Sequence, residues 1–506
     1  MSLFYTSGSV AALLFLVFLA CRALWNQRRR PAPFPPGPPA DPLIGNVRFF
    51  PVNDTPAGLT KLARKYGDVM YFNILGKSLV VLSSQEAASD LLEKRSAIYS
   101  SRPRSIAQEL IGWTDMLGFL PYGEQFHKQR KLFQQAFTKQ GCVVFQPSQL
   151  SQTHVLLKKV LQDPERFDDH VRRFSTAVIM EITYGYKVAS DDDPYLGMME
   201  RTTKIVEEAG NSLTILDFFP SLSYLPSWFP GNWFGHIAKD GPPLMRQMKE
   251  MPFEWVRQQM VIGNATPSFT SMHIEELERN GEASPKDLET LKVASAQMYT
   301  AGAETTWSSL MSIIAILLFH PEVQRKAQEE LDRVVGGGRL PDFGDRESLP
   351  YLEAVIQETT RWHPTTQLGL PHSSTADDIY RGMYIPKDAI VLYNSSAMSK
   401  DDRVYSNPDL FRPERFLPPE SEPSSVNINF GWGRRICPGR HLADASLWIV
   451  IASFLTAFEV VPAKDGKGQD IIPELNWLPG LASHPAPYPR VIRPRSSNAA
   501  QLVARL

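Results

Sequence analysis

The hydrophobic pattern of this chain is mainly helical. Polar and apolar residues recur at helical spacing from Tyr122 to Phe137. No proline interrupts the helix-compatible stretch between Pro285 and Pro321, and Ser284-Pro285 fits an N-cap followed by proline at the first helical position. We therefore expect one very long central helix there. The pattern predicts further helices at residues 85–95, 321–335, 350–362 and 440–454.

Strand signals are short and few. Two apolar runs, 69–75 and 79–82, flank Gly76-Lys77-Ser78 and predict a hairpin. We find no internal repeat, and the low-complexity sequence is confined to a proline-rich segment near the N-terminus. The predicted fold class is mainly α with a smaller β portion, α+β.

The N-terminal segment has the composition of a membrane anchor. Val10 to Cys21 is almost continuously apolar, and residues 3–21 carry no charge, close to the roughly 20 residues that a spanning helix needs. The alternative is a cleaved signal peptide, whose basic region precedes the apolar stretch, whereas here Arg28-Arg29-Arg30 follows it. We expect a retained single-pass helix with the main domain in the cytoplasm, under the positive-inside rule.

Six prolines between residues 31 and 39 forbid helix continuation and predict a stiff spacer. Beyond it, proline and glycine mark no clear internal linker. The expected organisation is an anchor at 1–25, a basic and proline-rich spacer at 26–42, and one catalytic domain at 43–506.

Composition limits the possible functions. The 506 residues are 43% apolar and 21% charged, which is typical of a globular protein that can enclose a bulky cofactor. The net charge of −1 gives no electrostatic footprint for nucleic acid. Cys21, Cys142 and Cys437 are too far apart for a CxxC metal site or a disulfide framework. We expect no nucleic-acid partner and a reducing environment.

The segment from Phe430 to Gly439 carries the clearest chemistry. Its glycines permit a tight backbone path whose N–H groups can point at the sulfur of Cys437. A thiolate held in this way can ligate iron. The alternative, a buried structural cysteine, is the usual role of an isolated cysteine.

Phe430, Gly433, Arg435, Cys437 and Gly439 match every fixed position of the signature of the cytochrome P-450 superfamily. The chain resembles that superfamily, of the microsomal type. The resemblance implies the P-450 fold, with its long central helix over haem b (iron protoporphyrin IX), and Cys437 as the axial iron ligand. Thiolate ligation favours O–O cleavage. The resemblance also assigns cofactor contacts to Phe430, Gly431, Arg435 and Gly439.

Two further segments match the superfamily in the expected order. Glu358-Thr359-Thr360-Arg361 has the ExxR spacing, which puts both charged side chains on one helical face. The segment 411–416 contains a second arginine, Arg415. The resemblance implies a buried structural cluster of Glu358, Arg361 and Arg415. A solvated surface pair is the alternative.

Residues 301–306, in the predicted long helix, resemble the oxygen-activation motif. Gly302 in a helix interior suggests close approach to the backbone, with oxygen as the candidate. The resemblance implies that Glu304 and Thr305 deliver protons. In the alternative, Thr305 bonds its i−4 carbonyl and Glu304 is exposed.

The helix at 122–137 departs from the superfamily's WxxxR pattern. Phe126 stands where tryptophan is expected, so an indole N–H is lost, and His127 replaces a common arginine. The resemblance implies haem propionate contacts from Arg130, Arg435, His372 and His127. A lone histidine is more often a satisfied or solvent-facing residue.

Electrons must come from a separate protein, because no G-x-G-x-x-G fingerprint occurs. The resemblance implies NADPH-cytochrome P-450 reductase as the flavoprotein donor, cytochrome b5 as a further candidate partner, and the endoplasmic reticulum membrane as the location. A basic patch is expected to face the reductase, with a merely solvated set of charges as the alternative; its members are Lys128, Arg130, Lys131, Arg434 and Arg440.

A mostly apolar distal pocket implies a lipophilic small-molecule substrate. By resemblance, its walls come from residues 111–119, 211–219, 299, 366–370 and 481–482. The general pattern is most similar to fungal members that oxidise terpenoid, polyketide or aromatic intermediates of secondary metabolism.

The favoured function is a haem-thiolate monooxygenase that hydroxylates or otherwise oxidises its substrate with O2. Two alternatives stay open at this point. One is a haem-thiolate isomerase or dehydratase, against which the Glu304-Thr305 pair argues. The other is a non-catalytic membrane haem-binding protein.

Overall fold

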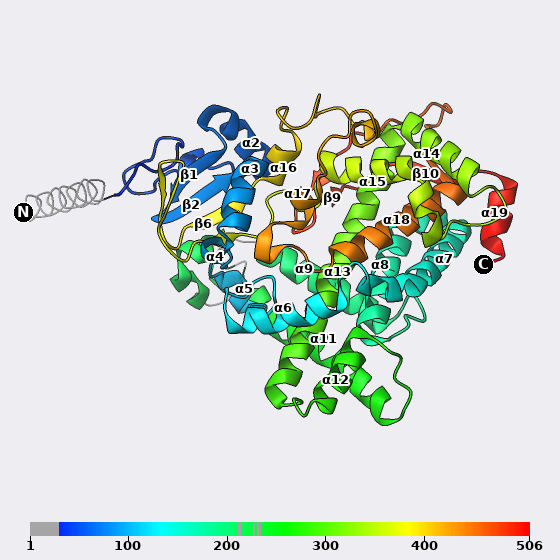
Figure 1. Cartoon of the computed structure of the whole chain (residues 1–506), viewed down its shortest axis with the longest axis horizontal. Coiled ribbons are helices and arrows are strands. Elements are labelled where there is room, and N and C mark those ends of the chain that lie inside the picture. The colour runs from blue at the N-terminus through cyan, green and yellow to red at the C-terminus, as the bar shows by residue number, and fades with distance from the viewer. Residues whose placement is uncertain (1–29, 211–213, 226–227, 230–231, 233) are drawn as a thin grey trace, which may run out of the picture.

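The computed structural model describes residues 30–506 apart from 211–213, 226–227, 230–231 and 233. Helices make up most of this structure, and a small sheet lies at the end nearer the N-terminus (Figure 1). The mainly helical fold class with a smaller β portion is confirmed. The expected membrane anchor lies outside the described residues.

The sheet has the strand order β1-β2-β6-β3. Strands β1 (Val69–Ile74) and β2 (Lys77–Leu82) form the predicted hairpin, with Val69 opposite Leu82. Strand β6 (Ile390–Tyr393) lies parallel to β2, and β3 (His372–Ser373) lies antiparallel to β6. The sheet thereby brings segments from both halves of the chain together.

The predicted central helix is α13 (Pro285–Phe319). The Ser284 side chain accepts a hydrogen bond from the Asp287 N–H, so the expected N-cap is confirmed. The helix packs against α8 (Phe167–Tyr184) and α18 (Arg440–Ala457) within the largest hydrophobic core. In the part of the chain that the structure describes, α13 alone is long and apolar enough to cross a membrane, but most of its apolar stretch is buried.

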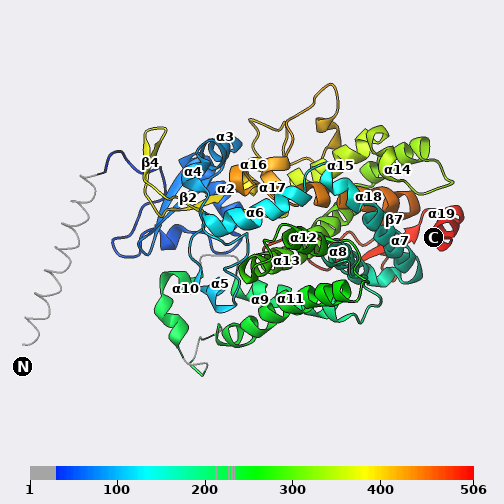
Figure 2. The ribbon, with the colours of Figure 1, turned by 60° about the horizontal axis from the view of Figure 1, so that its bottom comes forward.

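The remaining helices surround α13. Figure 2 shows α9 (Pro194–Ala209) and α11 (Gly235–Val261) on one side of it and α15 (Pro350–Trp362) on the other. The helices at 122–137, 321–335 and 350–362 are confirmed as α6 (Glu124–Ala136), α14 (Pro321–Val334) and α15. The hydrophobic pattern had not singled out α7 (Gln146–Gln162), α8, α9, α11 or α12 (Phe269–Arg279).

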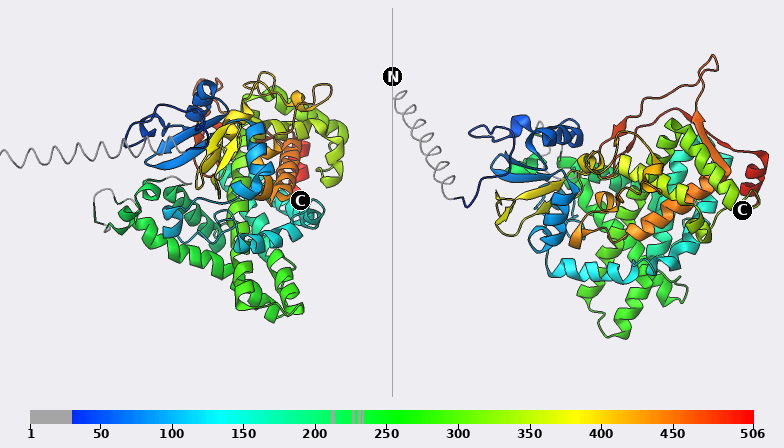
Figure 3. Two further views of the ribbon diagram at one scale, coloured as in Figure 1. Left: turned by 60° about the vertical axis from the view of Figure 1, so that its left-hand side comes forward. Right: turned by 45° about the horizontal axis from the view of Figure 1, so that its top comes forward.

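Three two-stranded sheets complete the strand content, and Figure 3 shows the fold from two further sides. The pairs are β4 (Asp378–Tyr380) with β5 (Met383–Ile385), β7 (Phe458–Pro462) with β10 (Arg490–Pro494), and β8 (Trp477–Leu478) with β9 (His484–Pro485).

The helix expected at 85–95 is present with a change of pitch. It starts as α3 (Gln85–Ala88) and continues as the π-helix η2 (Ser89–Lys94). The backbone of η2 then meets the loop that contains Cys437: a Cβ built on Gly433 would lie 2.3 Å from the Leu92 carbonyl oxygen. Only glycine fits at this contact.

The described part of the proline-rich segment is docked on the domain. The Phe34 ring stacks on Tyr71 with 4.0 Å between centroids, and the Tyr71 N–H donates to the Pro36 carbonyl at 3.0 Å. The Tyr384 N–H donates to the Pro33 carbonyl at 2.7 Å. Residues 33–36 of this segment are therefore packed against β1 and β5.

Candidate active site

A cavity of about 320 Å³ lies between α13, the cysteine loop and the sheet. Most of its wall is apolar, including Trp113, Phe119, Phe133, Val178, Met298 and Leu447. Cys437 and Phe430 line one side, and Ala301 to Thr306 of α13 contribute to the other, apart from the buried Ala303. The structure thus brings the two principal sequence motifs to one enclosed space.

The cysteine loop joins α17 (Val426–Phe430) to α18 through the short 3-10 turn η8 (Gly433–Arg435). The Cys437 N–H donates to the Phe430 carbonyl at 2.7 Å. Burial raises the pKa of the Cys437 thiol, while the Gly439 N–H and the cationic Arg130 act in the opposite direction. The loop therefore already supplies groups that stabilise a sulfur anion.

Two arginines at the edge of the cavity, Arg435 and Arg130, have no carboxylate partner among the described residues. Arg435 donates to the carbonyls of Ser100, Leu117 and Leu120 at 2.7, 3.0 and 2.6 Å. Burial, with repulsion from Arg102 and Arg130, lowers the pKa of Arg435 to about 8. Nη1 of Arg130 donates to the Ile436 carbonyl at 2.7 Å, and its buried Nε has no partner in the described structure.

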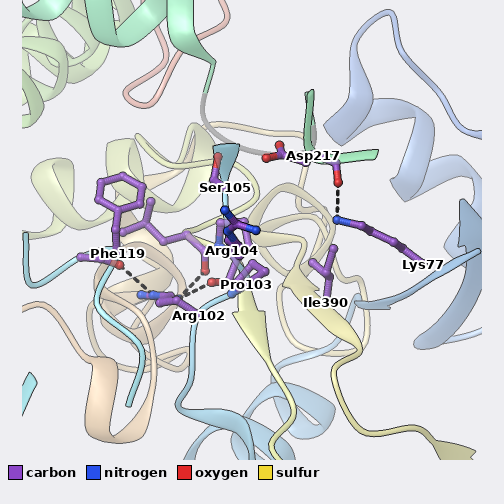
Figure 4. Close-up of a pocket in the computed structure, with 11 residues that line it drawn as sticks. Lys77, Arg102, Pro103, Arg104, Ser105, Phe119, Asp217 and Ile390 are labelled. Atoms are coloured by element: carbon purple, nitrogen blue, oxygen red, sulfur yellow. Dashed lines mark hydrogen bonds between the residues drawn. The ribbon is translucent and has the colours of Figure 1, made fainter. Parts of the chain in front are cut away.

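Arg102 is a third unpaired guanidinium at this edge, and sequence reasoning missed it. It donates to the carbonyls of Gly118, Leu370 and Pro371 at 2.8, 2.9 and 2.7 Å. Burial lowers its pKa to about 10. Figure 4 shows the Arg102 guanidinium beside Phe119 in the lining of a smaller pocket of about 20 Å³. Both residues also line the main cavity.

The two predicted histidines lie in different environments. His372 is buried, lines the cavity, and its Nδ1–H donates to the Tyr99 carbonyl at 2.7 Å. Burial and the charge of Arg102 hold the pKa of His372 well below its ordinary value of 6.5. His127 is exposed, packs against Tyr122, and does not line the cavity. His127 thus lies on the outer face of α6, and its expected propionate contact stays a prediction.

The opposite wall carries Glu304 and Thr305. The Thr305 hydroxyl donates to the Ala301 carbonyl at 2.7 Å, which is the i−4 bond of the alternative interpretation. Glu304 is not exposed to solvent as that alternative required: its side chain is 15% accessible and lies 3.1 Å from Arg172. The Thr203 hydroxyl also donates to Glu304 at 3.3 Å.

Gly302 permits a close helix contact. A Cβ at this position would lie 2.7 Å from Cδ1 of Ile179 on α8. We had expected oxygen as the group that approaches this backbone. The observed close approach instead comes from the packing of α8 on α13.

The Glu358, Arg361 and Arg415 side chains form a fully buried cluster below the cysteine loop. Nε of Arg361 lies 2.6 Å from the Glu358 carboxylate, and Nε of Arg415 lies 3.0 Å from it. The carboxylate also accepts the Arg412 N–H at 2.7 Å. The cluster is clear of the cavity, which agrees with a structural role rather than a chemical one.

This set of groups fits a haem. A thiol faces the cavity and most of the wall is apolar. Three guanidinium groups that line the cavity have no anionic partner among the described residues, and a dianionic porphyrin would supply one. The family model described as cytochrome P450 matches residues 35–489. The chain belongs to the cytochrome P450 family. It is a haem-thiolate monooxygenase, and membership implies an external redox partner and a lipophilic substrate.

Curated relatives cover nearly the whole chain. It is 36% identical to cytochrome P450 monooxygenase 136 of Postia placenta, across 99% of this chain and 96% of the relative. It is 38% identical to cytochrome P450 monooxygenase ple1 of Rhodocybe pseudopiperita, across 95% and 94%. It is also 38% identical to cytochrome P450 monooxygenase claR of Ampulloclitocybe clavipes, across 93% and 88%.

Two sequence expectations about surfaces need correction in this P450. Arg130 is buried, so it cannot contribute to the basic patch, whereas Lys131 and Arg434 are exposed. Tyr299 does not line the cavity, because its hydroxyl donates to the Tyr195 carbonyl on the other face of α13; Met298 lines the cavity instead. Of the expected segment 211–219, residues 211–213 lie outside the described structure.

Proposed function

We propose that this P450 inserts one oxygen atom from O2 into a lipophilic small molecule, by hydroxylation or a related oxidation. The observation that carries the proposal is that the Cys437 sulfur and the Glu304-Thr305 pair face one apolar cavity. When bound, a haem ligated by Cys437 supplies dioxygen activation. Arg130, Arg435 and His372 would hold its propionates, and Phe430, Gly431 and Gly439 would shape the loop beneath it.

Glu304 and Thr305 are proposed to deliver protons. The Glu304 carboxylate, held by Arg172 and Thr203, can take a proton from water and pass it into the cavity. The Thr305 hydroxyl donates to Ala301 but keeps lone pairs that accept from a water molecule. Apolar side chains make up most of the remaining wall, so Glu304 and Thr305 offer a polar route for protons.

The substrate class follows from the cavity wall. Trp113, Phe119 and Met298 favour burial of a carbon-rich ligand, while Gln297 and Thr366 offer a few polar contacts. We propose a terpenoid, polyketide or aromatic intermediate of fungal secondary metabolism. The three relatives named above are monooxygenases of fungi, which supports this choice.

Electrons are proposed to come from NADPH through a separate cytochrome P-450 reductase, with cytochrome b5 as a second donor. Lys131 and Arg434 are exposed and could meet an acidic partner surface. We further propose residues 1–25 as a single-pass anchor in the endoplasmic reticulum membrane, 26–42 as the connecting segment, and 43–506 as the cytoplasmic catalytic domain. The apolar stretch followed by arginines supports this orientation.

The test uses the full-length holoprotein reconstituted with reductase and supplied with candidate terpenoid and aromatic compounds. Substrate-dependent NADPH consumption, with mass detection of an added oxygen, is the expected result. Conversion of a peroxide without NADPH would indicate the isomerase or dehydratase instead, and binding without turnover would indicate a haem-binding protein. Cys437→Ala should lose the thiolate-type band of the reduced carbon monoxide complex, whereas Cys142→Ala, a buried cysteine outside the cavity, should keep it.

A further inference from the structure

The Tyr393 side chain lines the haem cavity, and its hydroxyl forms no hydrogen bond with the described residues. Tyr393 is the last residue of β6, and its side chain is 5% exposed. Burial raises the pKa of Tyr393 to about 12, so the phenol stays protonated and remains a donor. A phenol hydroxyl in a cavity wall that makes no hydrogen bond within the protein is free to donate to a ligand bound in that cavity.

The ring of Tyr393 is held in one place by two glycines. A Cβ on Gly369 would lie 2.0 Å from Cζ of Tyr393, and a Cβ on Gly431 would lie 3.3 Å from its Oη. Both glycines have positive φ, +58° and +80°. The hydroxyl therefore lies between the segment before β3 and the cysteine loop, where a larger residue in either segment would displace it.

The hydroxyl lies at the same edge of the cavity as the unpaired cations. Its ring is 6.1 Å from that of His372 on the adjacent strand, and the charge of Arg102 acts on it. On α6, Phe126 offers only carbon atoms and packs under the Arg435 guanidinium at 3.8 Å, so the donor that this helix presents to the cavity is Arg130. An anionic ligand at this edge would meet cations from Arg102 and Arg435 and a neutral donor from Tyr393.

We propose that Tyr393 is a further cofactor-binding residue, whose hydroxyl donates a hydrogen bond to a carboxylate of the haem at the edge formed by Arg102, Arg435 and His372. The inference rests on the proposed haem-thiolate function. It assigns to β6 a polar contact that Phe126 cannot make from α6.

The test compares Tyr393→Phe with a control, Tyr71→Phe. Tyr71 lies on β1 of the same sheet, its hydroxyl pairs with Ser78 at 2.9 Å, and it does not line the cavity. Haem transfer from each purified holoprotein to excess apomyoglobin is followed by absorbance. Tyr393→Phe should lose haem about tenfold faster than the wild type, since a hydrogen bond to a charged group is lost, and Tyr71→Phe should not change the rate. Equal rates for Tyr393→Phe and the wild type would overturn the proposal.

Thermal unfolding of the haem-free proteins separates cofactor binding from folding. Haem-free Tyr393→Phe should unfold at the wild-type temperature, because the hydroxyl makes no hydrogen bond with the described residues and the variant keeps the ring. A lower temperature for haem-free Tyr393→Phe would assign the hydroxyl to folding and overturn the proposal. Failure of the haem-thiolate function itself would appear separately, as a wild-type protein that lacks the thiolate-type carbon monoxide band.

Discussion

Arg172 on α8 and Glu304 on α13 form an ion pair across the distal wall of the haem cavity, with 3.1 Å between Nη1 and Oε2. The Arg172 guanidinium also lies 3.7 Å over the Trp307 ring. Glu207 on α9 is near enough that Glu304 contributes, after burial, to raising the pKa of Glu207. Glu304, the proposed proton donor, is thus paired with one cation, Arg172, and has a second carboxylate, Glu207, nearby.

Glu304→Gln should lower the rate of product formation by roughly 100-fold, because an amide cannot exchange a proton as a carboxyl group does. Haem content should stay at the wild-type level, since the partners of Glu304 are Arg172 and Thr203, and neither is a residue proposed to hold the haem. Steady-state product formation in H2O and D2O measures the effect. Glu329→Gln, at an exposed ion pair on α14, is the matched control. Wild-type turnover in Glu304→Gln would remove this residue from the mechanism.

Thr305→Ala should bind haem normally yet release hydrogen peroxide in place of most of its product. The variant deletes the hydroxyl that can accept from water beside Ala301. Product and peroxide are quantified per NADPH consumed. Thr290→Ala removes the same type of i−4 bond from α13, to the Lys286 carbonyl at 2.9 Å, away from the cavity, and should leave this ratio unchanged. An unchanged ratio in Thr305→Ala as well would contradict the assignment.

The features that were predictable from the sequence have local signals. The Ser284 cap and the proline-free run specify α13, and the short turn at Gly76 specifies the hairpin. The cysteine loop was recognisable because its glycines and Cys437 fall within one short segment. In each case, residues that are close in the chain make the structure.

The features that escaped prediction depend on contacts between distant segments. Arg102 meets the carbonyl of Leu370, 268 residues away, and nothing in its local sequence indicates this contact. The face of α13 that lines the cavity was also misjudged, because this helix is apolar and buried around much of its circumference, so Tyr299 and Met298 look equivalent in sequence. Similarly, the residue that approaches Gly302 comes from another helix, α8.

Arg361→Met should destabilise the protein by about 3–5 kcal/mol, because it leaves the Glu358 carboxylate buried with fewer cationic partners. The free energy of unfolding in urea and the yield of holoprotein measure this loss. Arg325→Met breaks an exposed i,i+4 pair with Glu329 on α14 and should cost less than about 1 kcal/mol. Similar losses in the two variants would show that burial does not set the value of the Glu358 cluster.

His363 should make the protein less stable in acid. Its ring stacks on Trp477 with 3.4 Å between centroids, Nε2 lies 3.1 Å from the Ser483 hydroxyl, and burial lowers the pKa of His363 to about 3 from an ordinary value of 6.5. In the unfolded chain His363 becomes protonated below pH 6.5, whereas in the folded protein it stays neutral down to about pH 3. The free energy of unfolding therefore falls as the pH drops through this range. The slope from one such group is about 1.4 kcal/mol per pH unit.

His363→Gln should flatten the pH dependence of the urea midpoint below pH 6.5, the ordinary pKa of a histidine. The other histidines contribute equally to both proteins. Parallel pH profiles for the two proteins would show that His363 has the same pKa in the folded protein as in the unfolded chain.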